Sequence, residues 1–99
     1  MAGRTALPTV AAIKRAVADE FGVTVTDLEG SSVLRIHSRP RHAAMLLAYR
    51  LTNHSKARIS AFFRKSPNLA GAVIAREERA GDRKIHEALR RATLSLVRR

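Results

Sequence analysis

The chain of 99 residues contains no cysteine and only four aromatic residues. Without cysteine, neither a disulfide nor a thiolate metal site can form, which fits a protein of the reducing cytoplasm. Four aromatic side chains are too few for the stacking platforms with which proteins bind RNA or single strands. No apolar run is long enough to cross a membrane, and residues 1–7 lack the apolar stretch of a signal peptide. We therefore expect a cytoplasmic protein without membrane contact.

Acidic residues are also scarce, with eight Asp and Glu against 19 Lys and Arg and a formal net charge of +11. All eight acids lie outside the span from Gly30 to Arg76. Within that span lie nine basic residues: Arg35, Arg39, Arg41, Arg50, Lys56, Arg58, Arg64, Lys65 and Arg76. Because protein surfaces usually mix both signs, this span indicates a polyanionic partner. Double-stranded DNA is the expected partner, which places the protein at the nucleoid. The alternative is a basic C-terminal helix on an anionic membrane, but its narrow apolar stripe is needed for the core.

The sequence lacks the motifs of catalysis and metal binding. Its four histidines have no cysteine partners and no H-x-x-x-H or H-E-x-x-H spacing, so a zinc site is not expected. The adjacent acids Glu77 and Glu78 point in different directions on a helix and form no acid/base pair. No G-x-x-x-x-G-K-[ST] segment occurs, which excludes an ATPase. We expect no enzyme, no cofactor and no small-molecule substrate.

Apolar periodicity predicts an all-α fold, a compact bundle of about five to six helices that contains a helix-turn-helix. Residues 1–8 are expected to be a flexible N-terminal segment, and residues 9–99 to form a single domain. The first helix is predicted to run from the cap Thr9 to Gly22, and residues 26–29 to form a capping box that opens a short helix. Residues 31–38 are expected to form a loop that ends where Arg39 and Pro40 start the next helix.

Two consecutive helices in the second half have the lengths of a helix-turn-helix. Ser55 is predicted to cap a helix over residues 56–63, and Arg64-Lys65 to form the turn. A longer helix over residues 66–79 follows, with Ser66 as its N-cap and Pro67 in its first position. Gly81 is expected to end this helix and Asp82 to cap the last one. The apolar stripe of that last helix consists of Ile85, Leu89, Ala92 and Leu96.

Residues 38–63 resemble the C-terminal DNA-binding domain of the bacterial replication initiator DnaA. The resemblance extends upstream through Ile13, Val17, Ala18 and residues 25–28, so it covers nearly the whole chain. The family has a segment a-R-x-R-q-x-A-M-x-L-a-x-x-L-T-x-x-S followed by an I-G-x-x-F pair. The positions that match in register are Arg39, Arg41, Ala44, Met45, Leu47, Leu51, Thr52, Ser55, Ile59 and Phe63. The resemblance implies that the Ser66 helix enters the major groove, and that the preceding basic loop reaches phosphate and the minor groove. It also implies phosphate contacts for Arg41 and Lys56, while Arg35 lies two positions from the family's minor-groove arginine.

The sequence departs from this family in its recognition signature, G-G-R-D-H-[ST]-T-V. Here residues 64–71 read Arg-Lys-Ser-Pro-Asn-Leu-Ala-Gly and keep none of the base-reading side chains. We therefore expect a DNA target other than the initiator's own box. Arg64 and Lys65 add phosphate-binding charge to the turn, and Gly71 stands where the family has a core valine. Since the ATPase is missing, a stand-alone reader of DNA is expected.

The sequence thus predicts a sequence-specific DNA-binding protein that regulates transcription, with activation of phage-like genes among its roles, or replication. The expected DNA-binding residues are Arg35, Arg39, Arg41, Lys56, Arg64, Lys65, Ser66, Asn68 and Arg76. Asn68 is expected to contact adenine, Ser66 a phosphate, and Arg76 the backbone or a guanine. A DNA-bending protein, RNA polymerase or another regulator are the expected protein partners. The alternative is a protein-interaction module that modulates the initiator or its inactivator through the apolar stripe of the last helix.

Overall fold

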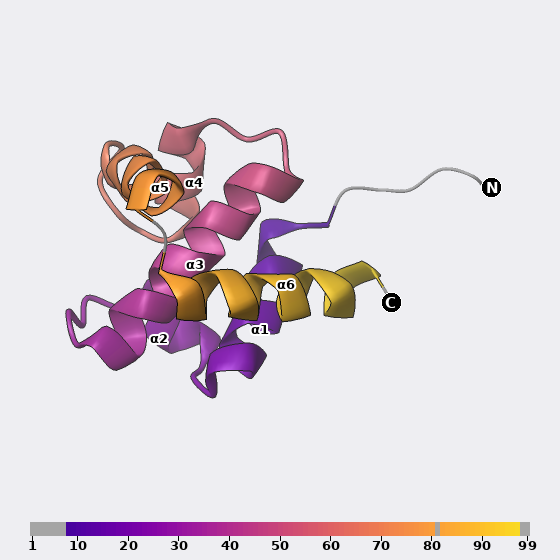
Figure 1. Cartoon of the computed structure of the whole chain (residues 1–99). Helices are drawn as coiled ribbons and strands as arrows, with labels where there is room; N and C mark the ends of the chain where they lie inside the picture. The colour runs from indigo at the N-terminus through magenta and orange to yellow at the C-terminus, as the bar shows by residue number, and fades with distance from the viewer. Residues whose placement is uncertain (1–7, 81, 98–99) are drawn as a thin grey trace.

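Six α-helices make up the regular structure of the part of the chain that the computed structural model describes, residues 8–80 and 82–97 (Figure 1). They are α1 (Val10–Phe21), α2 (Val25–Glu29), α3 (Arg35–Leu51), α4 (Lys56–Phe62), α5 (Leu69–Ala80) and α6 (Arg83–Val97). The all-α prediction is confirmed. Of the expected flexible segment, residues 1–7 lie outside the described residues, as does Gly81.

The first helix begins and ends where the sequence predicts. The Thr9 hydroxyl accepts a hydrogen bond from the Ala12 amide at 3.1 Å, and Gly22 ends α1 in the left-handed conformation with φ 69°. The predicted caps of α4 and α6 are also confirmed. Ser55 Oγ accepts from the Arg58 amide at 3.1 Å, and Asp82 Oδ1 accepts from the Lys84 amide at 3.0 Å.

Helix α3 lies at the centre of the bundle and contacts each of the other five helices (Figure 1). Helix α6 packs along α1 and also contacts α3, whereas α4 and α5 lie together on the other side of α3. The core residues of α3 include both small and large side chains, and they are Ala43, Ala44, Met45, Leu46, Leu47 and Ala48. The large side chains of Ile13, Leu28, Ile59, Phe63, Ile74 and Ile85 surround them. Burial of this apolar surface is the main stabilising contribution to the fold.

The apolar stripe of α6 is part of this core. Ile85, Leu89 and Ala92 are buried, and Leu96 packs against the core with partial exposure. The docking surface that the protein-interaction alternative needs is therefore occupied within the protein itself. No helix in residues 8–80 and 82–97 has the length and apolar character that a bilayer crossing requires.

The short helix α2 starts two residues earlier than its sequence pattern predicts. Its capping box consists of Thr24 and Asp27, whose side chains accept from each other's backbone amides at 3.0 Å, and not of Thr26 and Glu29. A carboxylate at the third helical position can serve this reciprocal arrangement whether it belongs to Asp or Glu. Glu29 instead pairs with Lys14 of α1 at 2.7 Å.

Helix α3 starts at Arg35, four residues before the predicted start, so Pro40 lies inside the helix. Proline removes one amide donor and is most common in the first turn, which is why the sequence suggested a later start. The additional turn is held by hydrogen bonds to residues that precede the helix. Ser38 and His37 donate their amides to the Leu34 carbonyl, and the Ser32 hydroxyl lies 3.0 Å from His37 Nδ1. Arg35 therefore belongs to the first turn of α3 and not to a loop.

Candidate nucleic-acid interface

Helices α4 and α5 form the predicted helix-turn-helix, but α5 starts three residues later than expected, at Leu69. Ser66 and Pro67 lie in the connection, where the Leu69 amide donates to the Ser66 carbonyl at 3.1 Å. The buried Ser60 of α4 takes over the expected capping role, because its Oγ accepts from the Ala70 amide at 2.9 Å. Ser60 Oγ also lies 3.3 Å from the Pro67 carbonyl, so one hydroxyl joins α4, the connection and the start of α5.

One side of α5 packs inward and the opposite side faces water. Ala70, Val73 and Ile74 are buried, as the sequence predicts. The exposed residues of α5 are Ala72, Ala75, Arg76, Glu78 and Arg79, and the exposed Asn68 lies just before the helix. Arg79 was not among the predicted DNA-binding residues, although its helical spacing from Ala72 and Ala75 places it on the same side. The exposed side of α5 is therefore free to enter a groove of DNA.

The turn between the helices contains a strained residue. Arg64 has φ 59°, a left-handed conformation that is common for glycine and uncommon for arginine. Its side chain is 80% exposed, and its only carboxylate neighbour among the described residues is Glu29 at 3.9 Å. An arginine thus stands at a position where glycine would adopt the left-handed conformation without strain. The side chain of this arginine extends into water.

The position of Arg41 does not suit the phosphate contact that the resemblance implies for this residue. The residue is only 5% exposed, and its guanidinium donates to the carbonyls of Leu28 at 2.7 Å, Ser32 at 2.9 Å and Asp27 at 3.0 Å. Burial lowers the pKa of this guanidinium from its ordinary value. Arg41 therefore holds the α2–α3 connection in place, and a phosphate has no access to it in this structure.

Two further cations of the predicted set are partly engaged. Lys65 donates to the Gly30 carbonyl and lies 3.5 Å from the Glu29 carbonyl, so it joins the turn to the α2–α3 connection. Desolvation, with Arg41 nearby, lowers the pKa of Lys65. Arg39 pairs through Nε with Asp82 at 3.1 Å and links α3 to the start of α6. Both residues position neighbouring elements and keep part of their surface accessible.

Three predicted arginines gather around one cavity of about 390 Å³. Arg35, Arg39 and Arg76 line it together with His42, from α3 and α5, and with the acids Glu77 and Asp82. Arg76 Nη2 lies 3.1 Å from His42 Nδ1, and Arg76 is 55% exposed. Burial, with Arg76 and Arg41 nearby, lowers the pKa of His42 to about 4, so this histidine is neutral at pH 7. The positive charge at this cavity therefore comes from the three arginines.

Lys56 lies at the start of α4, beside α5. Its ammonium stands 5.2 Å above the centre of the Tyr49 ring, and its stem lies against Gly71 of α5, where a Cβ would be 3.6 Å from Lys56 Cδ. Gly71 is thus half-buried under Lys56 and not in the core position that the family comparison suggested. Lys56 itself is exposed, and no carboxylate among the described residues pairs with it.

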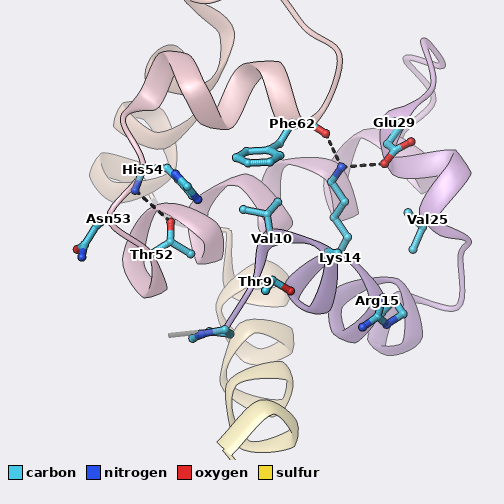
Figure 2. A pocket seen from close by; sticks show the side chains of 12 residues that line it. Thr9, Val10, Lys14, Arg15, Val25, Glu29, Thr52, Asn53, His54 and Phe62 are labelled. Carbon is cyan, nitrogen blue, oxygen red and sulfur yellow. Dashed lines mark hydrogen bonds and ion pairs between the residues drawn. The ribbon is translucent and has the colours of Figure 1, made fainter. Parts of the chain in front are cut away.

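Another cavity, of about 840 Å³, lies elsewhere, beside α1 and α4 (Figure 2). None of the nine predicted DNA-binding residues lines it. Its buried Lys14 donates both to Glu29 at 2.7 Å and to the Phe62 carbonyl, and its ammonium stands 4.7 Å from the centre of the Phe63 ring. Lys14 and Glu29 therefore satisfy each other within this cavity. No group of three or more potential metal ligands occurs within residues 8–80 and 82–97.

Two packed helices, a tight connection and a second helix with an exposed side are the features of a helix-turn-helix. The family described as "Bacterial dnaA protein helix-turn-helix" matches residues 10–67, more than half of the chain. The chain belongs to this family, which is a class of DNA-binding domains and not a class of enzymes. The match ends just before α5, within residues 64–71, where the recognition signature is replaced.

One curated relative is the chromosomal replication initiator protein DnaA of Magnetococcus marinus. It is 45% identical over 53 residues, which make up 54% of this chain. The same stretch is 12% of that relative, so the chain matches a small part of the initiator's length.

Proposed function

We propose that this protein is a sequence-specific reader of double-stranded DNA that places α5 in the major groove and acts as a regulator without catalysis at the nucleoid. The observation that carries this proposal is the exposed side of α5, which begins beside a cationic turn and ends beside an arginine-lined cavity. A helix with an accessible face and cations at both ends fits between two phosphate backbones.

Within this arrangement the side chains fall into base contacts and phosphate contacts. Asn68, at the start of α5, is exposed and suits bidentate recognition of adenine. Arg76 reads a guanine edge or binds the backbone. Lys56, Arg35, Arg64 and the Ser66 hydroxyl are exposed and bind phosphate, while Arg39 and Lys65 add charge from partly engaged positions. Arg41 acts by holding the α2–α3 connection.

The regulatory role we propose is at promoters, as for an activator of phage-like genes, or in the control of replication. Residues 9–99 act as one DNA-binding unit. A single unit with one recognition helix contacts few base pairs, which favours a partner on the same DNA, such as a DNA-bending protein or RNA polymerase.

Selection of bound sequences from a random duplex pool tests the proposal. The wild-type protein is expected to enrich a defined sequence, and Asn68→Ala to lose the preference at one base pair while the rest of the sequence is retained. Asn53→Ala is the matched control, because Asn53 is exposed in the α3–α4 connection and away from α5. An unenriched pool with the wild-type protein, or loss of preference in Asn53→Ala alone, would contradict the proposal.

A further inference from the structure

Three large apolar side chains stand in water within four residues of the α2–α3 connection and the first turn of α3. The exposed fractions are 87% for Val33, 63% for Leu34 and 65% for Ile36. A cluster of this kind costs hydrophobic free energy unless another surface covers it. We refer to these three residues as the apolar tip.

Hydrogen bonds hold the backbone on both sides of the apolar tip. Arg41 binds three carbonyls on the approach to the tip, including Ser32 O at 2.9 Å. Ser32 Oγ accepts from the Leu34 amide at 3.2 Å and lies 3.0 Å from His37 Nδ1. On the other side, Lys65 donates to the Gly30 carbonyl. Exposed apolar side chains on a hydrogen-bonded backbone are suited to insertion into a groove of another molecule.

The surroundings of the tip are rich in cations. Arg35 lies between Leu34 and Ile36 and is exposed. Val33 shares its cavity with Arg35, Arg39 and Arg76, where one of the two acids, Asp82, is paired with Arg39. The other acid, Glu77, is only 8% exposed and lies 3.9 Å from Arg76. Apolar side chains surrounded by arginines complement a groove with phosphate walls and a floor of stacked bases.

The position of the tip relative to α5 selects the groove. Lys65 joins the turn before α5 to Gly30, and Arg76 near the end of α5 lines the same cavity as Val33, so the tip lies along the side of α5. When α5 fills a major groove, a rigid projection at its side meets the neighbouring minor groove across one backbone.

We propose that the apolar tip is a wedge that enters the minor groove, partly unstacks a base step and bends the duplex. Apolar wedges of Leu and Ile between base steps kink DNA toward the major groove in proteins that bend it. This inference rests on the proposed function, and it assigns the bending activity to the protein itself.

Ring closure of a mixed-sequence linear duplex shorter than the persistence length of about 150 bp measures bending. The wild-type protein is expected to accelerate ring closure. A variant with Val33→Ser, Leu34→Ser and Ile36→Gln is expected to close rings about tenfold more slowly than the wild type, in line with the low end of the cost of bending. Because its cations are unchanged, it still binds the duplex in a titration at low salt. Its circular dichroism is expected to match the wild type, since the replaced side chains make no core contact.

The matched control carries Leu94→Gln and Val97→Gln, two exposed apolar positions of α6 with exposed fractions of 48% and 75%. It is expected to bend DNA as the wild type does. Equal ring closure by the tip variant and the wild type would overturn the wedge and leave a protein partner as the occupant of the tip. Wild-type binding without any acceleration would overturn the wedge while the proposed function stands. Absence of wild-type binding at low salt would overturn the proposed function itself.

Discussion

The two sides of the molecule use their cations differently. Two cations of α1 and α6 are paired closely with acids: Lys14 of α1 with Glu29 at 2.7 Å and Arg91 of α6 with Glu20 at 2.6 Å. On the helix-turn-helix side, Arg64 and Arg76 have carboxylate neighbours no nearer than 3.9 Å among the described residues, and their side chains are 80% and 55% exposed. The first two cations link helices through close ion pairs, whereas the side chains of Arg64 and Arg76 are available to a polyanion.

Arg41 shows that the position of a cation in the sequence does not by itself determine its role. It lies within the acid-free span, yet it binds three backbone carbonyls and is buried. A charge in the span therefore has one of two roles, and burial together with hydrogen-bond partners decides which. The following predictions test this division, from the largest expected effect to the smallest.

Arg41→Ala is expected to lower the free energy of unfolding by about 2–4 kcal/mol, because it leaves buried carbonyls without a donor. Arg35→Ala is the matched control, with an expected change within about 0.5 kcal/mol since its side chain is exposed. Urea denaturation followed by circular dichroism measures both. A stable Arg41→Ala protein that binds duplex much more weakly would show that Arg41 contacts phosphate after all.

Ser60→Ala is expected to cost about 1–2 kcal/mol, because the hydroxyl satisfies the Ala70 amide at the start of α5 and is fully buried. Ser66→Ala is expected to change stability by less than about 0.5 kcal/mol, since Ser66 is exposed and its side chain does not cap α5. Thermal unfolding of the two variants side by side checks the assignment. A larger loss of stability in Ser66→Ala than in Ser60→Ala would show that Ser66 caps α5.

Arg64→Gly is expected to raise the free energy of unfolding by up to about 1 kcal/mol, because glycine adopts the left-handed conformation at φ 59° without strain. The same variant is expected to bind duplex more weakly, because it loses one exposed charge on the helix-turn-helix side. Denaturation and a duplex titration measure the two effects. A less stable Arg64→Gly protein would contradict the backbone strain at φ 59°, and one that binds duplex as tightly as the wild type would contradict the phosphate contact of Arg64.

Much of the fold was predictable because it follows from local rules. Caps at Thr9, Ser55 and Asp82, the left-handed Gly22 and the apolar periodicity of α5 and α6 each depend on residues a turn apart. The start of α3 was not, because its first turn is held by Ser32 and Leu34, and Pro40 does not by itself forbid an additional turn. The start of α5 was missed for a similar reason, since its cap is Ser60, ten residues earlier in the chain.

The site was predictable in its location and less so in the role of each residue. The acid-free span leads to the connection and helices that form the helix-turn-helix side, and the exposure of Asn68 agrees with its proposed contact. The sequence does not reveal that the Arg41 guanidinium donates its hydrogen bonds to backbone carbonyls. The positions of those carbonyls relative to Arg41 depend on the tertiary fold. The exposure of Val33 and Ile36 could not be predicted from the sequence either, since valine and isoleucine are common core residues.

Salt dependence of duplex binding tests the division between the two sides most directly. With about five phosphate contacts, the logarithm of the wild-type association constant is expected to fall against the logarithm of salt concentration with a slope of about −4.5. Lys56→Ala, on the helix-turn-helix side, is expected to reduce the magnitude of this slope by about one. Arg91→Ala removes the same charge from the α1–α6 side and is expected to leave the slope unchanged. A slope near zero, or a change with Arg91→Ala and none with Lys56→Ala, would contradict the account.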